Sequence, residues 1–150
     1  MNKTHEALVA DFYRALATRD MDLFVRIQHE DVVYNISGHT PISGQVRGMK
    51  SLLEDILPQV FPALQMDSFQ FSKRWKIVCA DDRRIVCMME ADGLGTNGTR
   101  YDQRYVHMFE FRGDKISGVW EFFDTALANE IMFFDPSASK TGGTLPPFEF

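Results

Sequence analysis

The sequence predicts a single α+β domain, in which a curved sheet carries helices on one of its faces. Two patterns support this prediction. Apolar residues recur at helical spacing in the first third of the chain. From residue 66 onwards, aromatic and β-branched residues fill long runs that are separated by turn signals. Helices followed by a meander of antiparallel strands are typical of an α+β fold, and one domain accommodates 150 residues.

Three helices are expected in the N-terminal part. Leu8, Phe12 and Leu16 stand at positions i, i+4 and i+8, which indicates an amphipathic helix. Asp20 is suited to cap a shorter second helix. The apolar spacing from Met49 to Leu57 indicates a third helix.

One strand is expected between the second and third helices, over Val32–Ile36. Asn35 is a poor strand former, so it either contributes to a pocket or marks the end of the strand, and we favour the second interpretation. Residues Gly38–Gly48 are rich in Gly, Thr, Pro and Ser and are expected to form a loop.

Long strands then follow one another. Residues 66–80 and 85–94 are expected to pair as a hairpin. Asn97-Gly98 is a strong hairpin signal and leads into a strand that begins near Tyr101. Gly113 marks the turn into the last strand.

The C-terminal part contains a short helix and a tail. Thr125–Met132 is expected to form a helical cap. The tail is rich in Pro, Gly, Ser and Thr and should lack regular structure, so the chain divides into a domain over residues 1–134 and an irregular tail over residues 135–150. Phe148 and Phe150 are expected to dock on an apolar surface, because leaving two aromatic side chains in water is costly.

Composition excludes several classes of partner. The formal net charge is −5, and no cluster of Lys and Arg marks a basic face, so nucleic acid is not an expected partner. No apolar run approaches the roughly 20 residues of a membrane span, and no signal peptide is recognisable, so we expect a cytoplasmic protein. Cys79 and Cys87 fall on opposite faces of their hairpin and are expected to be free, buried thiols.

Turn lengths predict which residues share a face of the sheet. A two-residue Asn97-Gly98 turn pairs Met88 with His107, and a turn over Asp81–Arg84 pairs Ile77 with Met88. One face then carries Trp75, Ile77, Val86, Met88, Glu90, Asp92, Gln103, Tyr105, His107 and Phe109. Because carboxylates and an imidazole are costly to bury without partners, this face is expected to line a cavity.

Two further expectations follow from the register. His107 lies opposite Trp120 if the last turn is regular, or opposite Glu121 if one residue is bulged. The other face of the sheet is also apolar, and its residues are Val78, Ala80, Ile85, Cys87, Met89, Ala91, Val106 and Met108. The helices cannot cover both faces, so we expect a homodimer.

The segment Tyr101–Asp124, with its Phe-Glu-Phe and Trp-Glu-Phe-Phe-Asp runs, resembles the closing strands of SnoaL-like domains. These belong to the nuclear transport factor 2-like, ketosteroid isomerase-like superfamily. Gly38–Gly48 and Phe61-Pro62 are similar to the loop and third-helix exit of this family. The resemblance extends from about Thr4 to Met132.

This resemblance implies a cystatin-like cone, in which a curved, mixed sheet wraps around the helices and leaves a pocket at its open end, usually in a homodimer. It also implies the register that pairs His107 with Glu121. Residues 90–95 further resemble a strand of the phenazine-biosynthesis A/B proteins, whose glutamate at the position of Glu121 serves in acid/base work.

Departures from the family narrow the chemistry. Ketosteroid isomerases have a catalytic aspartate on the first strand, where this chain reads Tyr34-Asn35-Ile36, and His107 replaces their second oxyanion-hole residue. Limonene epoxide hydrolases pair an arginine with two aspartates, whereas this chain has Glu90, Asp92 and Glu121 at those places. The resemblance therefore argues against both of these activities.

A candidate site combines these residues. Glu121 is the expected general acid/base, with His107 as its partner. Residues expected to bind substrate are Glu90, Asp92, Tyr105, Trp75, Phe109, Tyr34 and Tyr13, although Tyr13 is more often a core residue at such a position. No spacing of His, Asp and Glu supports a metal site, and no cofactor is expected.

The suited reactions are proton transfers, namely isomerisation, cyclisation, dehydration or condensation of a small aromatic or polyketide-like molecule. Such a site acts near neutral pH because an apolar wall raises the pKa of a carboxylic acid. Two alternatives remain. The domain is a non-catalytic ligand-binding or assembly module, or His107 and Glu121 form an ion pair that only stabilises the sheet.

Overall fold

A computed structural model gives the fold and describes residues 3–133 and 145–148. Residues 145–148, in the predicted tail, form neither helix nor strand. The rest of the predicted tail, including Phe150, lies outside the described residues.

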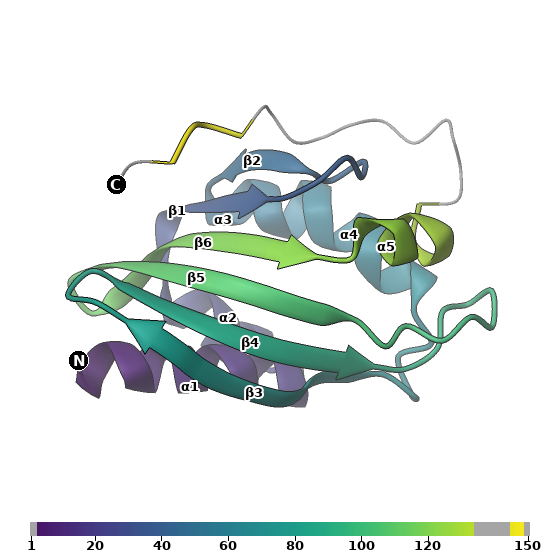
Figure 1. Cartoon of the computed structure of the whole chain (residues 1–150), viewed down its shortest axis with the longest axis horizontal. Helices are drawn as coiled ribbons and strands as arrows, with labels where there is room; N and C mark the ends of the chain where they lie inside the picture. Colours follow the sequence, from purple (N-terminus) through teal and green to yellow (C-terminus); the bar gives the residue numbers. More distant parts are fainter. Residues whose placement is uncertain (1–2, 134–144, 149–150) are drawn as a thin grey trace.

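The architecture is a six-stranded, curved and unclosed sheet with helices packed behind it (Figure 1). The strand order is β2-β1-β6-β5-β4-β3, and β1 pairs with β6 in parallel while the other neighbours are antiparallel. The strands are β1 (Gln28–Ile36), β2 (Gly44–Arg47), β3 (Gln70–Ala80), β4 (Arg84–Asp92), β5 (Arg104–Arg112) and β6 (Lys115–Phe123). The α+β prediction with a curved, mixed sheet is confirmed.

Seven short or long helical segments accompany the sheet in the described part of the chain. These are α1 (Lys3–Thr18), α2 (Met21–Arg26), α3 (Met49–Ser51), the π-helical turn η1 (Leu52–Ile56), α4 (Leu57–Val60), the 3₁₀ turn η2 (Phe61–Ala63) and α5 (Thr125–Ile131). Asp20 caps α2 as predicted, since its side chain accepts a hydrogen bond of 2.9 Å from the amide of Leu23. The third predicted helix is divided into α3, η1 and α4, because Pro58 has no amide hydrogen to continue the regular pattern.

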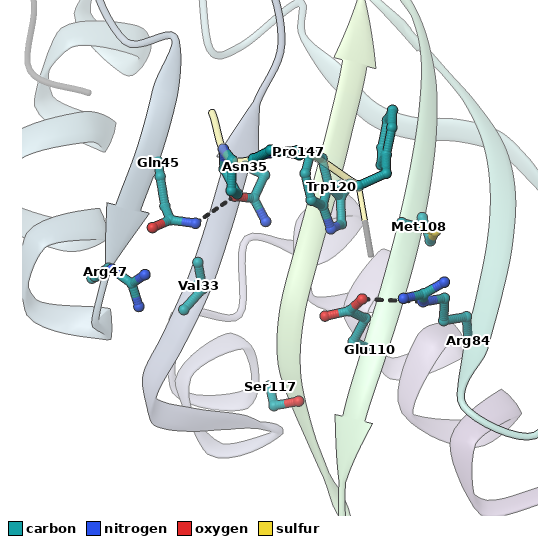
Figure 2. A pocket seen from close by; sticks show the side chains of 12 residues that line it. Val33, Asn35, Gln45, Arg47, Arg84, Met108, Glu110, Ser117, Trp120 and Pro147 are labelled. Atoms are coloured by element: carbon teal, nitrogen blue, oxygen red, sulfur yellow. Dashed lines mark hydrogen bonds and ion pairs between the residues drawn. The ribbon is translucent and has the colours of Figure 1, made fainter. Parts of the chain in front are cut away.

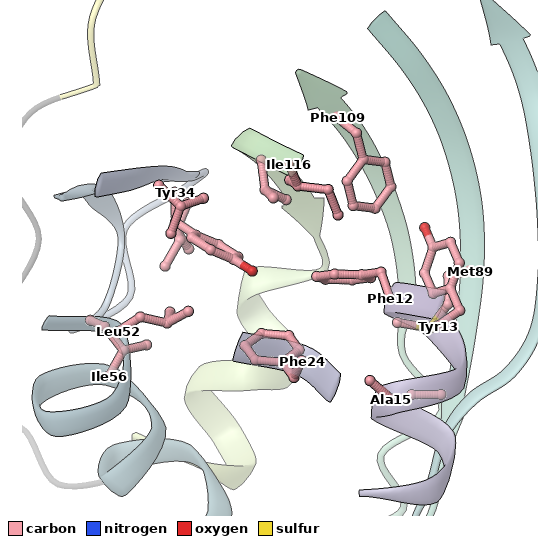
Figure 3. Packing of buried hydrophobic residues seen from close by; sticks show 14 of the residues in the cluster. Phe12, Tyr13, Ala15, Phe24, Tyr34, Leu52, Ile56, Met89, Phe109 and Ile116 are labelled. Atoms are coloured by element: carbon pink, nitrogen blue, oxygen red, sulfur yellow. The ribbon is translucent and has the colours of Figure 1, made fainter. Parts of the chain in front are cut away.

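The core lies between the helices and the sheet face that we call the inner face. Phe12 from α1 and Tyr34 from β1 point towards each other, and Leu52 and Ile56 approach from the third helical region (Figure 3). The rings of Phe12 and Phe109 meet edge to face, with centroids 5.0 Å apart. The hydrophobic stripe of α1 therefore packs directly on the middle of the sheet.

The pairing of β5 with β6 decides between the two registers left open by the sequence. His107 lies opposite Glu121, so the bulged alternative is the correct one. The additional residue is Ser117 within β6, whereas Gly113 occupies the tight turn with φ of +63°. The bulge brings the imidazole and the carboxylate to the same face.

Strand β4 presents the opposite set of residues to the one predicted. Cys87, rather than Met88, lies opposite His107, and Trp75 lies opposite Met89. The inner face of β4 therefore carries Ile85, Cys87, Met89 and Ala91. The outer face carries Val86, Met88, Glu90 and Asp92.

Two irregularities explain the reversal of β4. The loop after β4 holds three residues, because the amide of Gly95 donates to the carbonyl of Thr99 at 2.8 Å and Gly98 follows the turn with φ of +83°. Before β4, Val78 is an extra residue in β3, where the register shifts between Ile77 and Cys79. Each irregularity changes the register by one, so β5 and the part of β3 before Val78 keep their predicted faces, whereas β4 and the end of β3 are reversed.

Two smaller predictions are also corrected. Strand β2 (Gly44–Arg47) lies within the predicted loop and forms the sheet edge by pairing with β1. Both cysteines are free as expected, but only Cys87 is buried, because Cys79 lies on the edge strand β3 and is exposed.

Candidate functional site

A cavity of about 120 Å³, which we call the inner cavity, lies between the inner face of the sheet and the helices. Most of its lining is apolar or aromatic and consists of Phe12, Leu16, Met21, Phe24, Ile36, Ile42, Leu52, Ile56, Leu57, Val60, Phe61, Phe71 and Met89. Four polar residues complete the lining, namely Tyr34, Tyr105, His107 and Glu121. The polar groups come from β1, β5 and β6, whereas α1, α2 and the third helical region supply apolar walls.

The imidazole and the carboxylate are in direct contact. Nε2 of His107 lies 3.2 Å from Oε2 of Glu121. The side chain of His107 is 2% exposed, whereas that of Glu121 is 22% exposed. Both residues line the inner cavity, and Glu121 is the more exposed member of the pair.

A second hydrogen bond fixes His107 from behind. The phenol oxygen of Tyr13, on α1, lies 3.0 Å from Nδ1 of His107. Burial raises the pKa of Tyr13 far above its usual value, so the phenol keeps its hydrogen and can donate it to Nδ1. The ring hydrogen of a neutral His107 is then on Nε2 and points to Glu121.

The phenols around the cavity are bonded to other side chains. Tyr34 donates to Oε1 of Gln28 at 2.7 Å. The hydroxyl groups of Tyr101 and Tyr105 lie 2.9 Å apart. Burial, followed by the negative charge of nearby groups that include Glu121, raises the pKa of Tyr34 and Tyr105 well above the usual value. These phenols therefore remain protonated at neutral pH and act as fixed dipoles.

The arrangement can perform one kind of chemistry, which is proton transfer at Glu121. One carboxylate oxygen accepts a hydrogen bond from His107. In the described part of the chain, no hydrogen bond reaches the other oxygen, Oε1. A group in the cavity could exchange a proton with Oε1, while His107 stabilises the charged form of the acid.

Glu90 and Asp92 do not take part in this site, so their predicted convergence with His107 and Glu121 is wrong. Because β4 is reversed, both lie on the outer face. Arg74 binds Glu90 through two hydrogen bonds of 2.9 Å. Asp92 is paired with Lys73 at 2.8 Å and with Arg100 at 2.9 Å, and the hydrogen bonds from these cations hold the pKa of its carboxyl well below the usual range.

The other predicted residues divide into lining and support. Tyr34 and Tyr105 line the inner cavity. Trp75, Phe109 and Tyr13 are not among its lining residues and instead form an aromatic layer next to His107. Tyr13 stacks on Trp75 with centroids 4.7 Å apart and meets Phe109 edge to face at 5.9 Å.

A larger hollow of about 450 Å³ lies on the outer face of the sheet, beside residues 146–148 (Figure 2). Two pairs of its polar groups are bonded to each other. Arg84 binds Glu110 at 3.1 Å, and the amide of Gln45 donates to Oδ1 of Asn35 at 2.9 Å. Asn35 thus lies at the end of β1, one residue before Ile36, as favoured from the sequence, and it lines the outer hollow and not the inner cavity. The carboxylate here is paired with a guanidinium, which stays charged and does not exchange a proton near neutral pH, whereas the carboxylate of Glu121 is paired with an imidazole, so we place the candidate site in the inner cavity.

Sequence reasoning missed most of the apolar wall. The helical spacing that marks Phe12 and Leu16 as core residues also places them at the cavity, since core and cavity share one face of α1. The contact between Tyr13 and His107 joins residues 94 positions apart, and the sequence carried no signal for it.

The described residues contain neither a cluster of metal ligands nor a membrane-spanning helix. No three His, Cys, Asp or Glu side chains among them are grouped as a metal site would require. None of the helices in the described ranges is both long and apolar enough to cross a membrane.

Comparisons with known proteins agree with this fold. A family model described as the SnoaL-like domain matches residues 9–119. The comparison with curated proteins finds no match. Many solved structures are similar, and each of the three described below shares less than 25% identity with this chain, which shows the fold alone.

An NTF2-like protein from Burkholderia xenovorans LB400 has a TM-score of 0.70 and 20% identity, over 88% of this chain and 98% of its own. A protein of unknown function with a cystatin-like fold, from Xanthomonas campestris, has a TM-score of 0.71 and 23% identity, over 89% and 98% of the two chains. A proposed polyketide cyclase from Xanthomonas campestris pv. campestris has a TM-score of 0.63 and 16% identity, over 87% and 97%.

Proposed function

The chain belongs to the SnoaL-like domain family, and from this membership and the geometry of the inner cavity we propose that it is an enzyme that transfers protons without a cofactor. Isomerisation, cyclisation, dehydration and condensation are the reactions that one positioned acid/base group can perform. We propose a small aromatic or polyketide-like substrate, because the cavity is lined by aromatic and aliphatic side chains.

The observation that carries this proposal is the line of hydrogen bonds from Tyr13 through His107 to Glu121. A carboxylate against an apolar wall is costly unless it is bonded. Here Oε2 of Glu121 accepts a hydrogen bond from His107, which offsets part of this cost. The other oxygen, Oε1, accepts no hydrogen bond in the described part of the chain. An acid/base group requires an oxygen that is not already bonded within the protein, and Oε1 meets this requirement in the described part of the chain.

In the proposed mechanism, Oε1 of Glu121 removes a proton from the substrate and returns it to another atom. The Nε2 hydrogen of His107 stabilises the carboxylate before the transfer. This hydrogen bond weakens once Glu121 is protonated, because its acceptor is no longer charged. Tyr13 keeps His107 in the required tautomer. The apolar walls exclude water, which strengthens these interactions.

The test measures proton transfer before the natural substrate is known. The protein is incubated in D₂O with small ketones of one ring, such as cyclohexanone and acetophenone, and loss of the α-proton signal is followed by ¹H NMR. We expect the wild-type protein to accelerate exchange and Glu121→Gln to abolish this effect. Glu110→Gln, on the outer face and paired with Arg84, is the matched control and should retain exchange.

Equal exchange by wild type and Glu121→Gln would contradict the proposal. So would a wild-type protein that binds these ketones in the inner cavity without accelerating exchange, and this result would favour the ligand-binding alternative. If Glu121→Gln loses stability and exchange together, Glu121→Asp separates the two, since it keeps the carboxylate and is expected to recover part of the exchange.

We also propose a homodimer and a cytoplasmic location for this protein. Support for the dimer is the exposure of Val78, Met88 and Val106 on the sheet, which we call the outer-face patch. Met88 and Val106 are cross-strand neighbours, so their side chains form a continuous apolar surface. Cell fractionation tests the location.

A further inference from the structure

The charges around the inner cavity restrict the ligand that it can hold. Among its lining residues only His107 has an imidazole and only Glu121 a carboxyl group, and neither Lys nor Arg lines it. The phenol lining residues remain neutral, because burial raises the pKa of Tyr34 and Tyr105 well above the usual value. The charge of the lining is therefore decided by the His107–Glu121 pair alone.

Hydrogen-bond geometry then sets the sign of this charge. When the phenol of Tyr13 donates to Nδ1, the imidazole of His107 is neutral, and a carboxylate at Glu121 then gives the lining one negative charge. When Nδ1 carries a hydrogen instead, the imidazolium and the carboxylate cancel. The lining thus has a net charge of minus one or zero, and any imidazolium in it is already paired with Glu121 and not with an anionic ligand.

The acidic group of the cavity offers a ligand a hydrogen-bond acceptor. The hydroxyl of Tyr34 donates to Gln28, and the hydroxyls of Tyr101 and Tyr105 are bonded to each other. Glu121 lines the cavity, and its Oε1 accepts no hydrogen bond within the described part of the chain. A ligand satisfies it by donating a hydrogen bond, most strongly from a charged N–H group.

The walls and the size complete the description. The aromatic side chains Phe12, Phe24, Phe61, Phe71 and Tyr105 line the cavity together with Glu121. Aromatic faces attract an organic cation through their quadrupoles. A volume of about 120 Å³ is close to the roughly 150 Å³ of an engineered cavity that holds benzene, so a ligand of about one ring fits.

We propose that the inner cavity is specific for a small organic amine of about one ring, bound as its ammonium ion with the N–H group on Oε1 of Glu121, and that it rejects carboxylates and phosphates. This inference deepens the proposed function and rests on it, since the ligand is placed on the acid/base group. It adds the charge of the substrate, which the acid/base proposal leaves open.

The test compares three probes of similar size and different charge, namely benzylamine, benzyl alcohol and benzoate. Dissociation constants are measured at pH 7 by isothermal titration calorimetry with the full-length protein. We expect benzylamine to bind at least about tenfold more tightly than benzyl alcohol, which is the contribution of one charge-assisted hydrogen bond. Benzoate should show no binding at millimolar concentration.

Glu121→Gln removes the charge and keeps the shape. We expect this variant to bind benzylamine and benzyl alcohol about equally, whereas Glu110→Gln on the outer face keeps the wild-type preference. Ile56→Phe, which fills part of the inner cavity, should weaken the binding of both probes and so locates them. A loss of binding in Glu121→Gln is attributed to the charge only if the melting temperature of the variant matches that of wild type. If it does not match, Glu121→Asp, which keeps the carboxylate, must keep the preference for benzylamine over benzyl alcohol.

Two results would overturn the inference. One is binding of benzoate that is as tight as that of benzylamine, and the other is a preference for benzylamine that survives in Glu121→Gln. Failure of all three probes to bind also overturns it. The proposed function fails separately: ketone exchange that depends on Glu121 would leave the acid/base proposal standing even if the amine is not preferred.

Discussion

His107 is held between two oxygen atoms, with the phenol of Tyr13 behind it and the carboxylate of Glu121 in front. Its ring also stacks on Tyr105, with centroids 5.4 Å apart and planes 13° from parallel. These contacts fix both the orientation of the ring and the nitrogen that carries its hydrogen. Tyr13 is therefore a positioning residue, which acts on Glu121 through His107.

Tyr13→Phe tests this role. The change removes the partner of Nδ1 and leaves a buried nitrogen without a hydrogen bond, so we expect the free energy of unfolding to fall by about 1–3 kcal/mol. We also expect slower ketone exchange with little change in ketone affinity, because the tautomer of His107 is no longer fixed. Urea unfolding and the NMR exchange assay measure the two effects.

Tyr101→Phe is the matched control for Tyr13→Phe. Tyr101 is a buried tyrosine whose hydroxyl bonds Tyr105, without a contact to His107. This variant should lose stability. Its rate of ketone exchange, divided by the fraction of protein that is folded, should equal that of wild type. If Tyr13→Phe behaves in the same way, the phenol of Tyr13 only stabilises the core.

At the scale of single residues, the sequence indicated the central pair and missed its surroundings. His107 and Glu121 were recognisable because they are polar residues within apolar strand arms. Glu90 satisfied the same criterion but lies on the outer face with Arg74. The difference between them depends on register, which local composition does not encode.

Strand β4 shows how register errors arise at the scale of elements. Its limits were predicted to within about two residues, because a run of β-branched and apolar residues marks a strand whichever face each residue occupies. Its orientation depended on whether the Asn97-Gly98 turn has two or three residues, and both turns use Gly98 at positive φ. A single additional residue therefore reversed the strand.

Gly98→Ala tests the geometry of this three-residue loop. Gly98 has φ of +83°, and no heavy atom lies within 4 Å of the position that the alanine methyl group would take, so the substitution introduces backbone strain without a clash. We expect the free energy of unfolding to fall by about 1–2 kcal/mol, the usual cost of a left-handed conformation for an L-residue. Chemical denaturation measures this change.

Thr96→Ala is the control in the same loop. Thr96 is exposed, and its amide donates to the carbonyl of Ala63, a bond that the substitution leaves in place. We expect little change in stability. An equally small effect for Gly98→Ala would mean that the loop adopts another turn without loss, and that the register of β4 is less firmly fixed than the structure indicates.

In the whole molecule, the two faces of the sheet are covered in different ways. The inner face is closed by the helices and holds the cavity. On the outer face, Trp120 is only 8% exposed, because Phe148 packs on it with ring centroids 4.9 Å apart. This agrees with the prediction that Phe148 docks on an apolar surface. Farther from the tail, Val78 and Met88 remain 53% and 54% exposed.

A second copy of the chain is therefore expected to contact the outer-face patch, where the sheet is uncovered, and to leave Phe148 on Trp120. The ion pairs Arg74–Glu90 and Arg84–Glu110 lie on the same face. They place charges of both signs there, and such charges suit a self-complementary contact. An apolar outer face was predicted from the sequence, but the reversal of β4 changed which residues form it, and these ion pairs were not predicted.

Met88→Glu tests the dimer. Met88 is more than half exposed in the single chain, so the variant should fold normally, but in a dimer it would bury an unpaired charge. We expect sedimentation velocity to give a dimer for wild type at micromolar concentration and at least about tenfold weaker association for Met88→Glu. Val25→Glu introduces the same charge at an exposed apolar position on α2 and should remain dimeric. Phe148→Ala should also remain dimeric. Because Phe148 packs on Trp120, removing its ring should shift the fluorescence of Trp120 to the red. This shift is measured in a Trp75→Phe background, where Trp120 is the remaining tryptophan. A monomeric wild type would contradict the proposed dimer, and dissociation by Phe148→Ala would move the contact from the patch to the tail.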